Sequence, residues 1–188
     1  MKRPATLLLL APLLLALPLG ACTTRQPGPD VSGWGDPFTL GAQNALEDFG
    51  HTAGMEGRLD KSLFAALRVE QLAEAAQSDP LWQTGRISTL QPQLLMARRQ
   101  MRQAAGIAEA APSQPVEVGL YRALRAVQAG DMAQAQVALN GPAFPLGGAA
   151  TLQRLQHMPR LPLVDQAAAR TALIAGSPGP HSNSGLPF

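Results

Sequence analysis

The stretch DKSLFAALRVEQLAEAAQ, residues 60–77, decides the fold class of this chain. Its apolar residues recur every three or four positions, the spacing of one face of an α-helix. They are Leu63, Phe64, Leu67, Leu72, Ala75 and Ala76. The pattern stops at Ser78-Asp79-Pro80, because proline lacks the backbone N–H that a helix interior needs. The stretch therefore predicts a helix that buries one face in a core.

The composition around this helix favours the same fold class. From residue 22 onward the chain contains 28 Ala and 20 Leu, against 7 Val and 3 Ile. Ala and Leu are strong helix formers, whereas β-branched residues favour strands. Faces rich in alanine also let helix axes approach each other closely. We expect an all-α fold, a compact bundle of about five to seven short helices.

Helical spacing recurs throughout residues 38–175, the expected helical domain. Besides residues 60–77, helices are predicted over residues 39–55, 89–111, 115–129, 132–139, 149–157 and 164–175. Gly50 and Gly54 weaken the first of these, and Pro112 ends the second. Asp131 is expected to cap the helix that follows it, because its side-chain oxygen can accept from a first-turn N–H. Trp82 is expected to pack into the bundle.

The turn Ala129-Gly130-Asp131 joins two of the predicted helices. It resembles the middle of a tetratricopeptide repeat, in which a tight turn connects a pair of helices. No second copy occurs at the repeat's period of about 34 residues. A generic helical hairpin is therefore the favoured interpretation, and a repeat solenoid is the alternative.

The first residues have the anatomy of an export signal. Lys2 and Arg3 precede a Leu-rich apolar run over residues 5–19. This run is shorter than the roughly 20 residues that a membrane-spanning helix needs. It also contains Pro12 and Pro18, which disfavour a stable helix. The segment is therefore a poor permanent membrane span.

The run ends in Leu19-Gly20-Ala21-Cys22, which resembles the lipobox of bacterial lipoprotein precursors. The resemblance implies that residues 1–21 are a signal peptide and that Leu19, Gly20 and Ala21 are recognised by the signal peptidase. It also implies that Cys22 becomes the first residue, with diacylglycerol on its sulfur and an acyl chain on its amine. An ordinary secretory signal with a chance cysteine and an uncleaved anchor are the alternatives.

Cleavage before Cys22 would change the charge of the chain. It removes Lys2 and Arg3, so the basic residues fall from 15 to 13 against 13 acidic ones. The formal charge is then zero, and no nucleic-acid partner is expected, because such binding needs a positive field. Cys22 is the only cysteine, so an intramolecular disulfide is excluded.

Polar segments flank the helical domain on both sides. After Cys22, residues 23–37 are rich in Gly, Pro and polar residues and predict a flexible tether. Within it, Trp34 has no core to join and is a candidate contact for a partner or a lipid headgroup. Residues 176–188 contain three prolines and three glycines and predict a disordered tail.

The most basic stretch of the domain lies in the helix predicted over residues 89–111. Arg98, Arg99 and Arg102 are three and four residues apart, so they share one face and can hold a phosphate or carboxylate. No acid precedes Glu109 on this helix, so the patch is locally unbalanced. An interaction site for an acidic partner or anionic lipid is one interpretation, and a solvated face is the other.

The sequence offers little for catalysis or metal binding. Residues 50–54, GHTAG, superficially match a nucleophile elbow, but a helical pattern rather than a strand precedes them, which favours a helix end. His51, His157 and His181 lie far apart and lack the spacing of a metal site. His157 is expected to cap a helix end. We expect no metal, no cofactor and no catalytic residue.

Together these features predict a lipid-anchored helical module on the periplasmic face of the bacterial outer membrane. It would help to assemble or position another envelope protein without catalysing a reaction. In the lipoprotein class, the absence of Asp after the cysteine favours the outer membrane over the inner one, which is the alternative. A carrier that holds a small molecule or lipid in an apolar cavity between helices is the alternative function.

Overall fold

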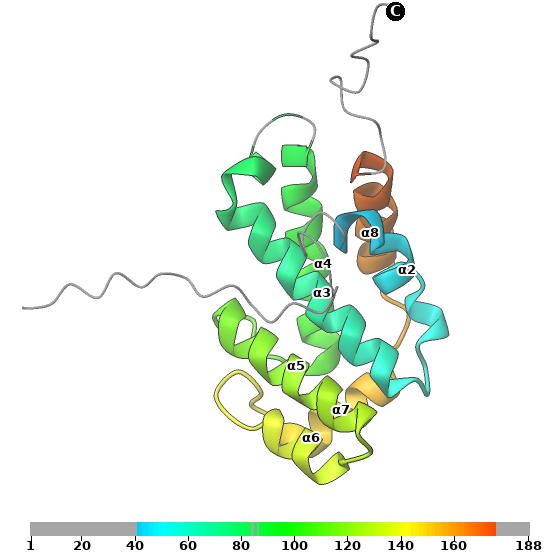
Figure 1. The fold of residues 1–188 in the computed structure, drawn as a ribbon, viewed down its shortest axis with the longest axis vertical. Helices are drawn as coiled ribbons and strands as arrows, with labels where there is room; N and C mark the ends of the chain where they lie inside the picture. The colour runs from blue at the N-terminus through cyan, green and yellow to red at the C-terminus, as the bar shows by residue number, and fades with distance from the viewer. Residues whose placement is uncertain (1–40, 84, 86, 176–188) are drawn as a thin grey trace, which may run out of the picture.

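The computed structural model describes residues 41–83, 85 and 87–175. Within these residues all regular structure is helical, apart from one isolated bridge between Gly141 and Phe144. The expected all-α bundle is therefore confirmed (Figure 1). The predicted signal peptide, Cys22, Trp34 and the predicted tail lie outside the described residues.

Residues 41–43 are helical, and seven further α-helices follow them in this part of the chain. They are α2 (Ala45–Phe49), α3 (Leu59–Ser78), α4 (Gln91–Ala105), α5 (Ser113–Gln128), α6 (Met132–Ala138), α7 (Gly147–Gln156) and α8 (Pro162–Ala175). Three short 3-10 helices lie between them, η1 (Thr52–Gly54), η2 (Pro80–Gln83) and η3 (Ile87–Leu90). None of the helices in the described ranges is long and apolar enough to cross a membrane.

Helix α3, which the decisive stretch predicted to within one residue at each end, is the centre of the bundle. It contacts α2, α4, α5, α7 and η2 (Figure 1). Because neighbours surround it, α3 buries polar residues such as Arg68 and Glu70 as well as its apolar face. The helix thus carries charged groups into the core, where each needs a partner.

Two predicted helices are shorter in the structure. The helix expected over residues 39–55 is interrupted within the described residues, because α2 ends at Phe49 and is followed by η1. The helix expected over residues 89–111 stops at Ala105, since Gly106 adopts a left-handed φ of 76°. Because apolar residues continue at helical spacing beyond Gly106, the pattern does not show where the helix ends.

The helical hairpin and its cap agree with the prediction. Helices α5 and α6 pack against each other, and Gly130 makes the turn with a φ of +77°. The Gln134 backbone N–H donates to Asp131 Oδ1 at 2.8 Å, which caps α6. The hairpin packs on α3 and α7. Trp82, only 6% exposed, packs into the core as expected.

Candidate functional site

Arg102 on α4 lies in the core and not on an open basic face. It is 3% exposed, and its Nε and Nη2 each donate a 2.7 Å hydrogen bond to the carboxylate of Glu70 on α3. Its Nη1 donates to the carbonyl oxygens of Glu109 and Ala111, both at 2.8 Å. The expectation of an accessible arginine without a neighbouring acid is therefore wrong at this position, because the acid comes from another helix.

The other two arginines of the predicted patch are also paired. Arg98 Nη1 lies 3.5 Å from Glu74 Oε2 and donates to Ser113 Oγ at 3.1 Å. Burial lowers the pKa of the Arg98 guanidinium, and the charge of Glu70 opposes this shift. Arg99 pairs with Glu109 at 2.9 Å on the surface, with both side chains more than two-thirds exposed. Each of the three arginines is therefore paired with a different acid, which is Glu70 for Arg102, Glu74 for Arg98 and Glu109 for Arg99.

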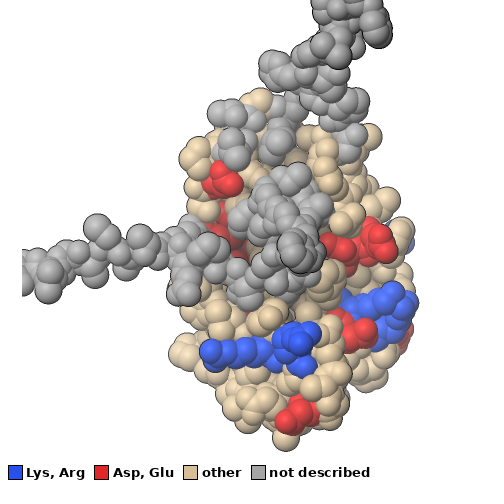
Figure 2. Space-filling model, viewed as in Figure 1, with Lys and Arg blue, Asp and Glu red and all other residues tan. Residues whose placement is uncertain are grey.

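The face of the molecule shown in Figure 2 carries mixed charge. On the face shown in Figure 2, the basic side chains gather in two separate groups, and acidic side chains lie between and beside them. This arrangement agrees with the equal numbers of basic and acidic residues from residue 22 onward. A binding site on this protein would therefore depend on the shape and side chains of a local hollow, and not on the net charge of the surface.

The segment GHTAG, residues 50–54, contains a threonine whose hydroxyl group stabilises the fold. Thr52 is fully buried, and its N–H and Oγ1 donate to Asp165 Oδ1 at 2.9 and 2.8 Å. The same Oγ1 accepts from the Leu161 N–H at 2.8 Å, so the side chain joins η1 to the start of α8. A fully buried hydroxyl with these partners is not presented to a substrate.

The histidines that the structure describes do not converge. His51 is exposed beside η1, and His157 is the C-cap residue of α7, where the sequence placed it. His181 lies outside the described residues. In the described part of the chain, no group of three His, Cys, Asp or Glu side chains is placed to hold a metal ion.

An apolar groove of about 620 Å³ is the candidate site with the clearest chemical character. It runs between the segment that links α4 to α5, α5 itself and the loop after α6. Its lining is Ala108, Ala110, Ala111, Pro112, Pro115, Val118, Gly119, Arg122, Ala138, Asn140, Gly141, Pro142, Ala143 and Phe144. These are small or apolar residues apart from Arg122 and Asn140. The groove is open to solvent along one side.

The walls of this apolar groove are held by specific contacts. The hydrogen bonds from buried Arg102 reach the carbonyls of the segment between α4 and α5, and the Ala108 N–H donates to the Ala143 carbonyl at 3.0 Å. A Cβ added at Gly119 would lie 2.5 Å from the Phe144 ring, so glycine lets this ring pack close to α5. Both walls are therefore built before any ligand binds.

Among the described residues that line the apolar groove, Arg122 is the one with a charged side chain. Its side chain is exposed, and it forms no hydrogen bond or ion pair with any described residue. A guanidinium next to an apolar wall can accept a carboxylate from a ligand through two parallel hydrogen bonds. No local sequence pattern distinguishes Arg122, since the groove forms only when segments distant in the chain meet.

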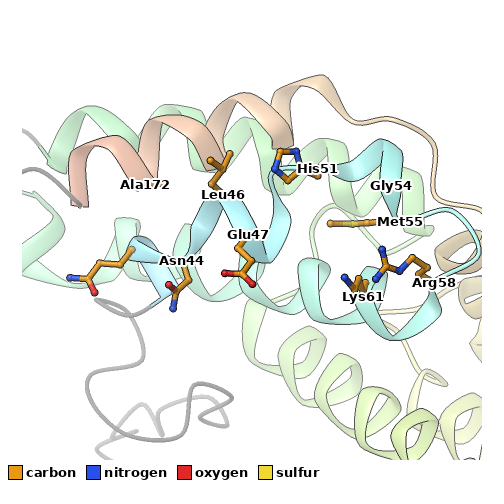
Figure 3. A pocket seen from close by; sticks show the side chains of 10 residues that line it. Asn44, Leu46, Glu47, His51, Gly54, Met55, Arg58, Lys61 and Ala172 are labelled. Carbon is orange, nitrogen blue, oxygen red and sulfur yellow. The ribbon is translucent and has the colours of Figure 1, made fainter.

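A second hollow, of about 530 Å³, lies where α2, η1 and the start of α3 meet (Figure 3). Its lining is Gln43, Asn44, Leu46, Glu47, His51, Gly54, Met55, Arg58, Lys61 and Ala172. We call it the polar hollow. In Figure 3, Arg58 and Lys61 lie side by side at one end of it. Its lining therefore contains charged side chains of both signs and polar side chains, in contrast to the apolar groove.

Comparisons of the chain with protein family models, with curated proteins and with solved structures give no match.

Proposed function

We propose that this protein is a lipid-anchored helical module of the bacterial envelope, which docks an extended apolar segment of another envelope protein in the apolar groove. The observation that carries the proposal is the groove itself, which combines small apolar walls with the cation of Arg122, for which the described residues supply no partner. The resemblance of residues 19–22 to a lipobox supports the anchor at Cys22 and a site of action on the periplasmic face of the outer membrane.

The shape of the groove favours a peptide as its occupant. Small lining residues let a backbone approach closely, and Pro112, Pro115 and Pro142 limit how much the walls must be ordered on binding. Arg122 selects a segment with a carboxylate next to its apolar residues. A site of this size recognises a short segment, which suits a transient contact.

A carrier of an acyl chain is the second candidate, because the apolar lining of the groove would also suit hydrocarbon. Carrier and cofactor sites typically bury more than about 70% of the ligand surface. This groove is open on one side and would leave much of a chain in water. A peptide can instead turn its polar side to solvent, so docking of a protein segment is favoured.

Site-specific crosslinking in intact cells tests the docking proposal. A photoactivatable residue at Val118, in the groove, should capture one defined envelope protein. Arg122→Glu should reduce the yield about tenfold, because it places like charge opposite the partner's carboxylate. The same photoactivatable residue at Gln166, exposed on α8, serves as the control. Equal products from both positions, or capture of lipid alone at Val118, would contradict the docking of a protein segment.

The anchor is tested by replacing its sulfur. Cys22→Ser should abolish fatty-acid labelling and move the processed protein from the membrane fraction to the soluble fraction, because two or more acyl chains are needed for stable anchoring. Gln166→Ala, exposed on α8, is the control and should keep both labelling and membrane fractionation. Full retention of Cys22→Ser in the membrane fraction at high salt would show that lipidation at this residue is not the anchor.

A further inference from the structure

Residues 108–112 between α4 and α5, which we call the linker wall, form one side of the apolar groove. The residues of this wall are Ala108, Glu109, Ala110, Ala111 and Pro112, and all of them except Glu109 line the groove. Small side chains bury little apolar surface, so they contribute little to fixing the segment that carries them. The position of the linker wall therefore depends on the hydrogen bonds of its backbone.

One guanidinium group holds the backbone of the linker wall. Arg102 Nη1 donates to the carbonyl oxygens of Glu109 and Ala111, both at 2.8 Å, and to that of Ala108 at 3.3 Å. The other side of the same guanidinium, Nε and Nη2, donates two 2.7 Å hydrogen bonds to the carboxylate of Glu70 on α3. Because a guanidinium is planar and rigid, fixing one side of it also fixes the direction of the other. Glu70 thus sets the position of the linker wall through Arg102.

The linker wall is in turn tied to the opposite side of the groove. The Ala108 N–H donates to the carbonyl oxygen of Ala143, in the loop after α6, at 3.0 Å. Ala143 also lines the groove. Within the linker wall, the Ala111 N–H donates to the Ala108 carbonyl at 3.1 Å. A shift of the linker wall would therefore change the width of the groove.

Stability alone does not account for a buried ion pair at this place. The side chains of Arg102 and Glu70 are 4% and 1% exposed, so both charges have been removed from water. The free energy lost on burying two charges is often as large as their attraction, and apolar residues of similar volume often give equal or greater stability. Apolar side chains could not, however, donate hydrogen bonds to the carbonyls of the linker wall.

We infer that Glu70 and Arg102 are positioning residues of the apolar groove, which hold the linker wall in the conformation that binds a partner segment. Neither residue lines the groove, so both act through the backbone of the linker wall. The inference rests on the proposed docking function. It gives the ion pair a role in binding that can be separated from its role in folding.

The double variant Glu70→Leu/Arg102→Met separates the two roles. Urea denaturation should show that it keeps most of the wild-type stability, because it leaves no buried charge unpaired. Exchange of the Ala108 N–H with deuterium, followed by NMR, should nevertheless become roughly tenfold faster, since the linker wall has lost the donor to its carbonyls. Capture of the partner by a photoactivatable residue at Val118 should fall about tenfold, because the groove is no longer preorganised.

Arg102→Lys is a second variant, which keeps a positive charge beside Glu70 but lacks the fork of donors that an arginine provides. It should show the same faster exchange at Ala108 and the same loss of capture. Arg99→Met is the matched control, because Arg99 lies on the same helix and pairs with Glu109 through exposed side chains. In the control, both measurements should stay within about twofold of the wild-type values. Circular dichroism checks that each variant is folded.

Unchanged exchange at Ala108, or unchanged capture at Val118, in the folded variants would overturn the inference. The exchange measurement needs no partner, so it tests the linker wall independently of the docking function. Absence of capture by the wild-type chain would contradict docking. Normal capture by the wild-type chain and the variants alike would leave docking intact and remove Glu70 and Arg102 from it.

Discussion

Arg102→Met should lower the free energy of unfolding by about 3–5 kcal/mol, the range expected when one partner of a buried ion pair is removed. The side chains of Arg102 and Glu70 are 4% and 1% exposed, and two 2.7 Å hydrogen bonds join them. The variant leaves the Glu70 carboxylate buried without its cation. It also removes the donors to the carbonyls that hold one wall of the apolar groove.

Urea denaturation followed by circular dichroism measures this loss of stability. Arg99→Met removes an arginine from the same helix, but its pair with Glu109 is exposed, so a change below about 1 kcal/mol is expected. The double variant Glu70→Leu/Arg102→Met should recover much of the lost stability, because it leaves no buried charge unpaired. Similar losses for Arg99→Met and Arg102→Met would show that burial of the Glu70 pair does not matter.

Gly148→Ala should destabilise the protein by about 3 kcal/mol, because it forces two helices apart. A Cβ at Gly148 on α7 would lie 1.9 Å from the Gln136 carbonyl oxygen on α6, and a backbone atom cannot swing away as a flexible side chain can. The backbone at Gly148 has no positive φ, so the penalty comes from the contact alone.

Thermal and chemical denaturation of the variant measure this effect. Gly54→Ala is the control, because a Cβ there meets no atom within 4 Å, and a change within about 0.5 kcal/mol is expected. If Gly148→Ala were as stable as Gly54→Ala, the close approach of α6 and α7 would not contribute to the fold. Loss of groove crosslinking at Val118 in the Gly148 variant should accompany the destabilisation, since α6 leads into the groove loop.

Local sequence patterns predicted most of the helices well. The bounds of α3, α5, α6 and α8 lie within about two residues of the expected ones, because apolar spacing, prolines and the Asp131 cap are all local signals. The errors lie at glycines. The end of α4 at Gly106 depends on a left-handed turn, which the continuing alanine pattern concealed.

Local sequence patterns predicted the candidate sites less well than the helices. The arginines of α4 form a local sequence pattern, but the acids that pair with Arg98 and Arg102 come from α3. The pattern on α4 therefore does not show that these two positive charges are balanced. Arg122, Arg58 and Lys61 carried no recognisable motif. The prolines and glycines around residues 112–115 and 141–142 signalled turns, yet nothing local showed that these turns face each other across a groove.

By itself the sequence determined the all-α class and the positions of most helices, because both follow from neighbouring residues. Lipidation of Cys22 stays a prediction from the sequence. Only the tertiary structure decided which helices meet. Glu70 and Arg102 are 32 residues apart, and their pairing depends on how α3 and α4 pack. Helical spacing specifies that a face is buried, but long-range packing decides which face it meets. Packing also decides whether a charge is paired, as in Arg102, or has no partner among the described residues, as in Arg122.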